Sequence, residues 1–366
     1  MSRRTILTVV GARPQFIKAA PVSRALAASF NEVLVHTGQH YDYGMSNVFF
    51  AEMEMRPPDF HLAAGGGTHG EQTGKMLIEI EKVLHSVKPD YMLVYGDTNS
   101  TLAGALAAAK AQVPLAHVEA GLRSYNRAMP EEINRILTDH VSSLLFCPTD
   151  AAVENLAKEG ITKGVHRVGD VMYDALLHNL ALARKQSNIL KRLGLGTRSY
   201  ALATVHRAAN TDDPARMVAI LQALGKLSTR VIFPVHPRTR KLIWERGLSV
   251  SDNVVLIEPL GHFDILILQE NADCILTDSG GMQKEAYLLG VRCITLREET
   301  EWVETVQAGW NMLTGVEPEA IRESFETWHP SGQRPALYGN GHASAEICEI
   351  LMREIHGAES ESGTSG

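Results

Sequence analysis

The residue types best suited to chemistry in this chain are carboxylates that stand just behind short apolar runs. Asp97 follows the run at 91–95, and Glu119 follows the run at 115–118. Glu131 comes directly after a proline. Carboxylates that share a partly desolvated site can have their pKa values pushed apart, so that one acts as an acid and another as a base. These residues therefore favour proton-transfer chemistry.

Each of these carboxylates also has a purely structural interpretation. Glu131 and Arg135 are four residues apart, which is the spacing of an ordinary ion pair on one helix face, worth a few tenths of a kcal/mol. Asp97 follows an apolar strand and precedes a helical segment, so it is also a candidate N-cap, as is Thr98. The sequence leaves both alternatives open.

The second half of the chain carries histidines and a glycine turn in corresponding places. His206-Arg207 and His236 follow apolar runs, and another run is followed by Asp278-Ser279-Gly280-Gly281. Glycines between a strand and a helix let backbone N–H groups approach a diphosphate, and the helix dipole favours the anion. An ordinary strand–helix turn is the alternative, since such turns recur in folds of unrelated function. Glu285, one turn further on, is either an acceptor for ribose hydroxyls or a solvated helix residue.

Signals for a resident cofactor or metal are weak. There is no G-x-G-x-x-G after either first strand and no G-x-x-x-x-G-K-[ST], so neither a dinucleotide nor ATP is expected. The four cysteines form no C-x-x-C pair and are expected to be buried, reduced thiols. His36 and His40 have metal-like spacing, but Gly38 between them argues against a shared helix face. We expect no cofactor and no metal.

The elements that must position these residues alternate regularly along the chain. Short runs that are apolar on both faces are each followed by a turn and an amphipathic stretch, which is typical of a parallel sheet covered on both sides. The predicted strands of the first series are Thr5–Val10, Val33–His36, Tyr91–Tyr95, Leu115–Val118, Leu144–Cys147 and Val165–Val168. Those of the second series are Tyr200–Val205, Val231–Val235, Val254–Ile257, Cys274–Thr277 and Arg292–Leu296.

Two consecutive series predict an α/β protein of two Rossmann-like, doubly wound domains facing a central cleft. We expect an N-terminal domain at 1–169 and a C-terminal domain at 170–348. Residues 349–366 would form a helix end and a disordered tail that packs back on the first domain. Ligands of such sheets bind beyond the carboxyl ends of the strands, where the polar residues above are found.

Length, composition and charge exclude several classes of protein. A chain of 366 residues with 45% hydrophobic and 21% charged residues is typical of a soluble protein of two domains. A net charge of −7 argues against a nucleic-acid partner. The basic start and the apolar run behind it are too short for a signal peptide, and no stretch is long enough to cross a membrane. We therefore expect a cytoplasmic protein without a membrane partner.

Several ordered motifs resemble the non-hydrolysing UDP-N-acetylglucosamine 2-epimerase family, whose fold is similar to that of GT-B glycosyltransferases. The resemblance covers roughly residues 5 to 310. The matching runs are Gly11-Ala12-Arg13-Pro14, Gly96-Asp97-Thr98, His117–Arg123, Pro130–Arg135, Thr204–Arg207, Pro234–Pro237 and Asp278–Glu285.

The resemblance implies a homodimeric enzyme that interconverts UDP-GlcNAc and UDP-ManNAc without a cofactor, in polysaccharide biosynthesis. The catalytic group that it implies is Asp97, Glu119, Glu131 and His206. The substrate ligands that it implies are Arg13, Lys18, Arg135, Arg207, His236, Ser279, Gly280, Gly281, Gln283, Glu285 and Thr300.

The chemistry of the implied reaction explains this set. The C2 hydrogen of the sugar is not next to a carbonyl, and oxidising a neighbouring carbon would need a nicotinamide for which no fingerprint is present. The remaining route eliminates UDP together with the C2 proton to give a glycal, and UDP then adds back after reprotonation from the other face. This route needs a base, an acid on the opposite face and donors that stabilise charge on the diphosphate.

Two segments depart from the family pattern. Allosterically regulated bacterial members resemble Gln-His-x-Gln where this chain has Gln39-His40-Tyr41-Asp42, which puts activation by a second UDP-GlcNAc in doubt. Many members have arginine at the position of Trp302. The 39–42 segment and the glycine-rich 65–70 segment look more like a sister branch that acts on UDP-2,3-diacetamido-2,3-dideoxy-glucuronate.

The same 2-epimerisation on that uronate is therefore an alternative function. It needs a cation for the C6 carboxylate, and Arg123 and Arg127 are the candidates. Further alternatives are a GT-B glycosyltransferase, a hydrolase that releases UDP, and a non-catalytic sensor of nucleotide sugars.

Overall fold

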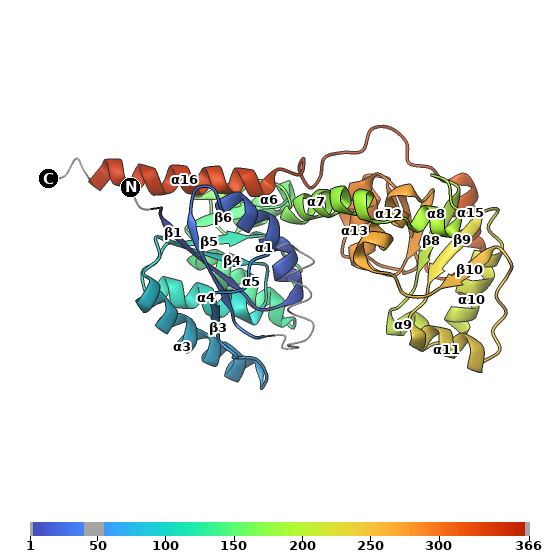
Figure 1. The fold of residues 1–366 in the computed structure, drawn as a ribbon, viewed down its shortest axis with the longest axis horizontal. Helices are drawn as coiled ribbons and strands as arrows, with labels where there is room; N and C mark the ends of the chain where they lie inside the picture. Colours follow the sequence, from blue (N-terminus) through green and yellow to red (C-terminus); the bar gives the residue numbers. More distant parts are fainter. Residues whose placement is uncertain (1–2, 40–54, 363–366) are drawn as a thin grey trace. The chain divides into compact units, whose positions relative to one another are not determined.

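The computed structural model describes residues 3–39 and 55–362. The chain divides into two compact units (Figure 1). The first contains Met1–His178 and Ala336–Gly366, and the second contains Asn179–Pro335. Both units are α/β, as the alternation in the sequence predicts.

The first unit is built on a parallel sheet. Within its described residues, seven strands lie in the order β3-β2-β1-β4-β5-β6-β7, which is the doubly wound order with a switch between β1 and β4. Its strands are β1 (Thr5–Val10), β2 (Asn31–His36), β3 (Phe60–His61), β4 (Tyr91–Tyr95), β5 (Leu115–Val118), β6 (Leu144–Cys147) and β7 (Val165–Arg167). β4, β5 and β6 are buried along their whole length, because helices cover both faces.

Helices join consecutive strands of this parallel sheet, and two further helices, α7 (Val171–Gln186) and α16 (Ala343–Ser362), follow the last strand or close the chain. The joining helices are α1 (Arg13–Leu26), α3 (His69–Val87), α4 (Asn99–Lys110), α5 (Pro130–Val141) and α6 (Asp150–Lys158). α3 begins with a capping box, in which Thr68 and Glu71 bond each other's backbone N–H groups. α5 begins at Pro130, since proline suits the first position of a helix.

The C-terminal helix α16 belongs to the first unit. It packs against α1, and Ile347, Leu351 and Ile355 join Leu26 in the buried core on that face of the sheet. Within the expected helix end and tail at 349–366, the helix continues to Ser362, and residues 363–366 lie outside the described residues.

The second unit repeats the same plan with fewer strands. In the described residues its sheet has six parallel strands in the order β10-β9-β8-β11-β12-β13, with the switch between β8 and β11. The strands are β8 (Tyr200–Thr204), β9 (Arg230–Pro234), β10 (Val254–Ile257), β11 (Cys274–Thr277), β12 (Arg292–Thr295) and β13 (Asn311–Leu313). The helices are α8 (Ile189–Leu193), α9 (Ala208–Thr211), α10 (Pro214–Gly225), α11 (Pro237–Glu245), α12 (His262–Asn271), α13 (Gly280–Leu289), α14 (Val303–Gln307) and α15 (Pro318–Thr327).

Every strand predicted from the sequence is present, with ends that differ by no more than two residues. β3 and β13 were not predicted, because strands of two and three residues give no recognisable period. The units differ from the predicted bounds of 1–169 and 170–348 at two places. The first unit extends past residue 169 to His178, which lies within α7, and residues 336–348 belong to the first unit.

Two further features concern the whole described chain. All four cysteines are free and buried, as expected. Among the helices within residues 3–39 and 55–362, none carries an apolar stretch long enough to span a bilayer.

Candidate active site

The predicted residues of the first unit lie at the switch point of its sheet, where the loops behind β1 and β4 meet. Gln15 joins the two loops. Its side-chain oxygen accepts from the backbone N–H groups of Gly11 and Ala12 at 2.8 and 3.0 Å, and its amide donates to the Tyr95 carbonyl at 2.8 Å. Gln15 is 1% exposed and was not singled out from the sequence, since a glutamine in the first turn of a helix is ordinary.

Gly11 is required by close packing at this point. A Cβ atom placed on Gly11 would lie 2.1 Å from the hydroxyl oxygens of both Ser100 and Thr37. Those hydroxyls are 2.8 Å apart, and Ser100 also donates to Gln39. The loop behind β1 is thereby held against the start of α4.

Asp97 is not the cap of α4. The N-cap is Thr98, whose hydroxyl accepts from the Thr101 N–H, so the capping interpretation of Asp97 is wrong. The Asp97 carboxylate instead accepts a short hydrogen bond from the guanidinium of Arg135. Arg135 also donates to Glu132 at 2.8 Å. The expected helical pair of Arg135 with Glu131 is therefore replaced by a link from α5 to the loop behind β4.

Glu119 has an unusual backbone at the end of β5. Its φ angle is +73°, in the left-handed region that residues with a Cβ rarely adopt. Both its N–H and the next one donate to the Phe146 carbonyl at 3.1 Å. Such strain persists where the surrounding structure holds it, and it is concentrated at functional sites.

Lys18 and Glu119 form a largely buried ion pair. The Lys18 Nζ donates to Glu119 Oε1 at 2.7 Å, and both side chains are 13% exposed. Burial alone would lower the pKa of Lys18, but the charge and hydrogen bond of Glu119, with the charges of Asp97 and Asp170, hold that pKa above its ordinary value. Lys18 therefore stays a cation that neutralises the acids around it.

Glu132 is the buried acid of α5. Its side chain accepts from the backbone N–H groups of Ser124 and Tyr125 at 2.9 and 2.8 Å. Burial would raise the pKa of Glu132, but these bonds and the charge of Arg135 keep it below the ordinary value. Glu132 therefore fixes Arg135 and the loop before α5, while Glu131 next to it faces outward.

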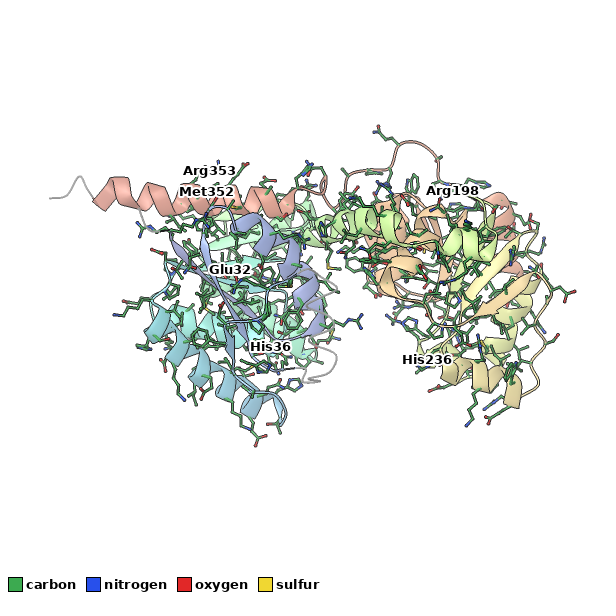
Figure 2. All side chains as sticks on the ribbon, in the orientation of Figure 1. Glu32, His36, Arg198, His236, Met352 and Arg353 are labelled. Atoms are coloured by element: carbon green, nitrogen blue, oxygen red, sulfur yellow. The ribbon has the colours of Figure 1, made fainter. Side chains whose placement is uncertain are left out.

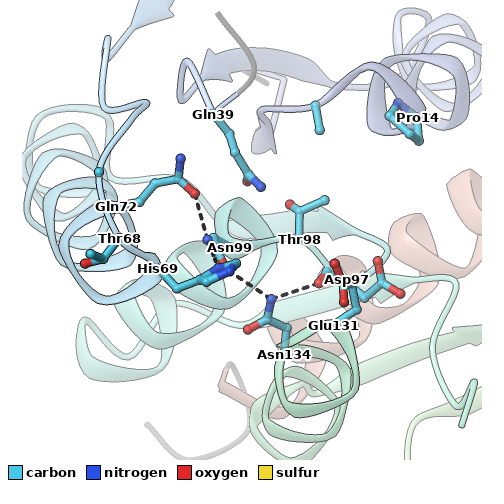
Figure 3. A pocket seen from close by; sticks show the side chains of 12 residues that line it. Pro14, Gln39, Thr68, His69, Gln72, Asp97, Thr98, Asn99, Glu131 and Asn134 are labelled. Carbon is cyan, nitrogen blue, oxygen red and sulfur yellow. Dashed lines mark hydrogen bonds between the residues drawn. The ribbon is translucent and has the colours of Figure 1, made fainter. Parts of the chain in front are cut away.

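A pocket of about 480 Å³ opens at the same point (Figure 3). Asp97 and Glu131 line one side of it. Asn134 donates to the Asp97 carbonyl at 2.9 Å and to the Asn99 side chain, which in turn donates to Gln72 (Figure 3). The complete lining is Ala12, Pro14, Gln39, Gly67, Thr68, His69, Gln72, Asp97, Thr98, Asn99, Glu131 and Asn134. The pocket combines two carboxylates with a wall of neutral amides.

In the second unit, the switch point brings together His206 behind β8 and Asp278 behind β11. Asp278 is fully buried and accepts from the His206 Nδ1 at 3.0 Å, from the backbone N–H of Arg207 at 3.0 Å and from Asn210 at 3.0 Å. Burial would raise the pKa of Asp278, but these donors hold it below its ordinary value. Asp278 is therefore an anion that orients the loop behind β8.

The hydrogen bond to Asp278 raises the pKa of His206, and this effect outweighs the burial that would lower it. The His206 side chain is 59% exposed. Its Nδ1 is engaged by Asp278, so Nε2 is the ring atom available to a ligand. His236 is also exposed and precedes α11 directly (Figure 2).

The glycine turn begins α13 as predicted. Ser279 is the N-cap, and its hydroxyl accepts from the Met282 N–H at 3.5 Å. A Cβ atom on Gly280 would lie 1.9 Å from the Glu301 Oε1 atom. Glu301 also accepts from Arg207 at 3.3 Å and from Arg297 at 2.8 Å. A carboxylate with two arginine partners thus lies over the turn that the sequence assigns to a diphosphate.

The other predicted residues of the second unit surround this turn. Thr300 donates to Gln283 at 2.5 Å, and Gln269 donates to Glu285 at 2.8 Å. Burial raises the pKa of Glu285, although the Gln269 bond opposes it. Glu285 is therefore not the freely solvated helix residue of the alternative interpretation.

Trp302, which stands where the resemblance leads us to expect arginine, lies under the ammonium of Lys284, 4.5 Å from the ring centroid. Of the Gln39–Asp42 segment, residues 40–42 lie outside the described residues, as does His40 of the proposed histidine pair. In the described parts of the chain, no group of three or more His, Cys, Asp or Glu side chains is arranged to hold a metal ion.

The structure gathers the predicted residues into two groups. The first unit holds Arg13, Lys18, Asp97, Glu119, Glu131 and Arg135, and the second holds His206, Arg207, His236, Ser279, Gly280, Gly281, Gln283, Glu285 and Thr300. The first group carries carboxylates with cations between them, which suits proton transfer. The second carries cations and a helix start, which suits an anion.

Known proteins are similar to this chain over nearly all of its length. The family model for UDP-N-acetylglucosamine 2-epimerase matches residues 24–352. A UDP-N-acetylglucosamine 2-epimerase homolog from Methanococcus maripaludis is 52% identical over 352 residues, covering 94% of this chain and 99% of the relative. A UDP-2,3-diacetamido-2,3-dideoxy-D-glucuronate 2-epimerase from Pseudomonas aeruginosa is 48% identical over 361 residues, covering 95% and 99%.

A solved structure gives the same result for the fold. The UDP-GlcNAc 2-epimerase from Methanocaldococcus jannaschii superposes with a TM-score of 0.85 at 43% identity, covering 96% of this chain and 99% of that chain. Together with the two parallel sheets, this likeness confirms the predicted GT-B-like α/β architecture.

Proposed function

Because this chain belongs to the UDP-N-acetylglucosamine 2-epimerase family, we propose that it inverts C2 of UDP-GlcNAc and so interconverts it with UDP-ManNAc. It is an isomerase of UDP-sugars. The proposed route is elimination of UDP to a glycal, followed by re-addition. The observation that carries this proposal is the group of Asp97, Glu119 and Glu131 around the switch point of the first sheet, with Lys18 and Arg135 between them.

In this proposal the first unit moves the protons. Asp97 and Glu131 line one pocket. One carboxylate takes the C2 proton as UDP leaves, and in the return step another acid protonates C2 of the glycal on the opposite face as UDP adds back. Glu119 and Lys18 form the buried pair behind them. Lys18 and Arg135 offset part of the negative charge, which lets several acids share a small space.

The second unit, in this proposal, holds UDP while the bond between C1 and the diphosphate oxygen breaks. The turn at Ser279–Gly281 and the arginine Arg207 face the negative charge that develops on the leaving group. His206 is oriented by Asp278 and presents Nε2 to the same charge. Glu285 is the proposed partner of the ribose hydroxyls.

Exchange of the C2 hydrogen tests the reaction. Incubated with UDP-GlcNAc in D2O, the enzyme should place deuterium at C2 of both UDP-GlcNAc and UDP-ManNAc. Transfer of the sugar to an added acceptor without C2 exchange would identify a glycosyltransferase. Steady release of UDP and free sugar would identify a hydrolase, and tight UDP binding without any turnover would identify a sensor.

The second candidate is the same reaction on UDP-2,3-diacetamido-2,3-dideoxy-glucuronate. The relative from Pseudomonas aeruginosa that carries this name is 48% identical, whereas the UDP-N-acetylglucosamine 2-epimerase of Methanococcus maripaludis is 44% identical. The amide wall of Gln39, Gln72, Asn99 and Asn134 beside the two acids supports a sugar with a second acetamido group.

The second candidate function requires a cation that binds the carboxylate of the uronate. Among the described residues, none that lines the pocket is a lysine or an arginine. Arg123 has a side chain that is 1% exposed and makes paired bonds to Glu159 at 2.7 and 2.8 Å. The buried Arg123 guanidinium is therefore already paired within the protein, and Arg127 is the exposed candidate that remains. Parallel D2O incubations with the two nucleotide sugars decide between the candidates, because only the true substrate gains deuterium at C2.

We also propose a homodimer. Tyr125, Met129, Ile133 and Leu137 recur every four residues along α5 and the loop before it, and they are 68%, 39%, 47% and 43% exposed. Met129, at the N-cap of α5, and Ile133 and Leu137 within the helix lie on one face, and exposed apolar side chains of this kind support an interface. Light scattering should give twice the mass of one chain, and Ile133→Lys should halve it. Trp244→Ser, at an exposed residue of the second unit, is the control that should leave the mass unchanged.

We propose a cytoplasmic location and a role in polysaccharide biosynthesis. The four free, buried cysteines support a reducing compartment. Loss of the gene should remove an N-acetylmannosamine-derived sugar from the surface polysaccharide of the host, and unchanged polysaccharide would contradict this role.

A further inference from the structure

A histidine and an aspartate are buried together behind the acids of the first unit. His117 stands in the middle of the apolar strand β5, and Asp139 stands in the last turns of α5. Their side chains are both 0% exposed. The proposed function above assigns neither of them a role, although burying two ionisable groups is costly unless they are fully paired.

Both ring nitrogens of His117 face acceptors. Nδ1 lies 2.7 Å from the Asp139 Oδ1, and Nε2 lies 2.7 Å from the carbonyl oxygen of Gly96. A carbonyl oxygen can only accept, so Nε2 must carry a proton. An ionised Asp139 can also only accept, so Nδ1 carries a proton as well.

The surroundings of Asp139 identify it as the ionised partner. Its Oδ2 accepts from the Arg123 guanidinium at 2.7 Å and from the Gly121 N–H at 3.1 Å. Burial would raise the pKa of Asp139, but the hydrogen bond and charge of His117 and the charge of Arg123 hold it below the ordinary value. Arg123 is in turn paired with Glu159, so the two cations and two anions of this cluster balance.

The bond from His117 ends on the residue before Asp97. Gly96 has φ +61°, and its N–H donates to the Val118 carbonyl at 3.0 Å. A Cβ atom on Gly96 would lie 3.3 Å from the Lys18 Nζ atom, so this turn packs directly against the Lys18–Glu119 pair. The next carbonyl, that of Asp97, accepts from Asn134 at 2.9 Å.

We propose that His117 is a positioning residue for the reaction, which as a doubly protonated ring bonded to Asp139 fixes the Gly96–Asp97 turn and thereby the Asp97 carboxylate. The proposal rests on the proposed function in taking Asp97 as a reacting group. Asp97 is then fixed at three points: His117 holds the preceding carbonyl, Asn134 holds its own carbonyl, and Arg135 holds its carboxylate. Asp139 couples the first of these to α5, the helix that supplies the other two.

The protonation of His117 is tested on the unmodified enzyme. In ¹⁵N NMR spectra of protein labelled at histidine and recorded at neutral pH, both ring nitrogens of one histidine should show directly bonded protons. That signal should disappear in His117→Gln. A His117 ring with one unprotonated nitrogen at neutral pH would overturn the proposal, whether or not any variant folds.

The positioning role is tested by kinetics of the C2 exchange in His117→Gln. A displacement of a reacting group by about 1 Å can cost about a hundredfold, so kcat should fall by about that factor while KM changes little. Affinity for UDP alone, which the proposal assigns to the second unit, should be unchanged, and an unchanged thermal unfolding curve serves as the check on folding of the first unit. The matched control is His140→Gln, at an exposed histidine of α5, which should keep full activity.

The outcomes separate this inference from the proposed function. If the unmodified enzyme shows no C2 exchange with either nucleotide sugar, the proposed function fails whatever His117 does. If the enzyme exchanges C2 and His117→Gln keeps its kcat, the positioning role fails alone. Equal losses of kcat and of UDP affinity would also contradict it, because they indicate general unfolding.

Discussion

The two units have the same strand order around their switch points, yet they treat the polar residues there in opposite ways. In the first unit the Lys18 and Glu119 side chains are 13% exposed and paired with each other. In the second unit the His206 and Arg207 side chains are 59% and 43% exposed. The first unit has its charges arranged before any ligand arrives, whereas the second presents cations to the solvent.

This difference follows from the chemistry that we propose for each unit. Groups that move protons must be held in fixed geometry and shielded from water, since their reactivity depends on their neighbours. Groups that bind a diphosphate must stay accessible, because the ligand has to reach them from the solvent. The two units thus share one fold, but the site of the first is arranged before a ligand binds, whereas the site of the second is open to the ligand.

The largest expected effect comes from breaking the paired site of the first unit. Glu119→Gln keeps the shape of the side chain but removes the charge that faces Lys18. Acid–base groups contribute about 10² to 10⁴ in rate, so C2 exchange should fall by about a thousandfold. The change is measured by deuterium incorporation, with Glu79→Gln on the exposed face of α3 as control. Exchange within a factor of about two of the unmodified rate would remove Glu119 from the site.

Substituting one glycine by alanine in each unit compares how tightly the two sites are packed. A Cβ atom on Gly11 would lie 2.1 Å from two hydroxyl oxygens, whereas the nearest atom to one on Gly281 is the Ser279 Oγ at 3.9 Å. Gly11→Ala should therefore lower the free energy of unfolding by about 1–3 kcal/mol. Gly281→Ala should fold normally and lose UDP affinity, because its methyl group occupies the place of the ligand.

Thermal unfolding and UDP titration of both glycine variants check this comparison. A Gly281→Ala variant that unfolds early, or that binds UDP normally, would show that the turn is an ordinary strand–helix connection. An unaffected Gly11→Ala would contradict the tight packing of the loop behind β1.

The affinity of the second unit for UDP should depend on pH, because it depends on the protonation of His206. The pKa of His206 is raised by Asp278, so the imidazolium persists as the pH rises through the ordinary histidine value of about 6.5. Affinity for UDP should fall only as the pH passes the raised pKa. Asp278→Asn removes the anion, so the fall should move to lower pH and weaken binding at pH 7 by about tenfold. Calorimetric titrations across this range would contradict the account if both proteins lost affinity at the same pH.

The smallest effect is expected from the carboxylate that lies over the glycine turn. Glu301 is 44% exposed and paired with Arg207 and Arg297, so its interactions are worth about 1 kcal/mol or less. Glu301→Gln removes a negative charge from the proposed diphosphate site and should tighten UDP binding by up to about fivefold. Weaker binding in this variant would mean that Glu301 serves to orient the arginines.

The sequence predicts the architecture well because strand and helix patterns are local. Runs such as 91–95 and 274–277 are apolar on both faces, which is a property of buried parallel strands, and each is a strand. The strand ends then indicate which polar residues share one edge of each sheet. Both groups of candidates were found in this way.

The partners of the site residues were less predictable, because they depend on contacts between distant segments. Asp97 and Thr98 both suit an N-cap. Only the three-dimensional structure shows that Thr98 is the N-cap and that the Asp97 carboxylate accepts a hydrogen bond from Arg135 instead. The strained backbone of Glu119 has no signal in the sequence. His117 did have one, since a histidine inside an apolar strand needs a buried partner, but the sequence does not name Asp139.

The most direct test of the account asks whether the bond to UDP breaks. UDP-GlcNAc carrying ¹⁸O in the oxygen between C1 and the β-phosphorus is incubated with the enzyme, and the position of the label is followed by ³¹P NMR. Elimination to a glycal predicts that the label moves into the non-bridging positions of the β-phosphate while C2 gains deuterium in D2O. Epimerisation at C2 with the ¹⁸O held in the bridging position would contradict elimination and re-addition.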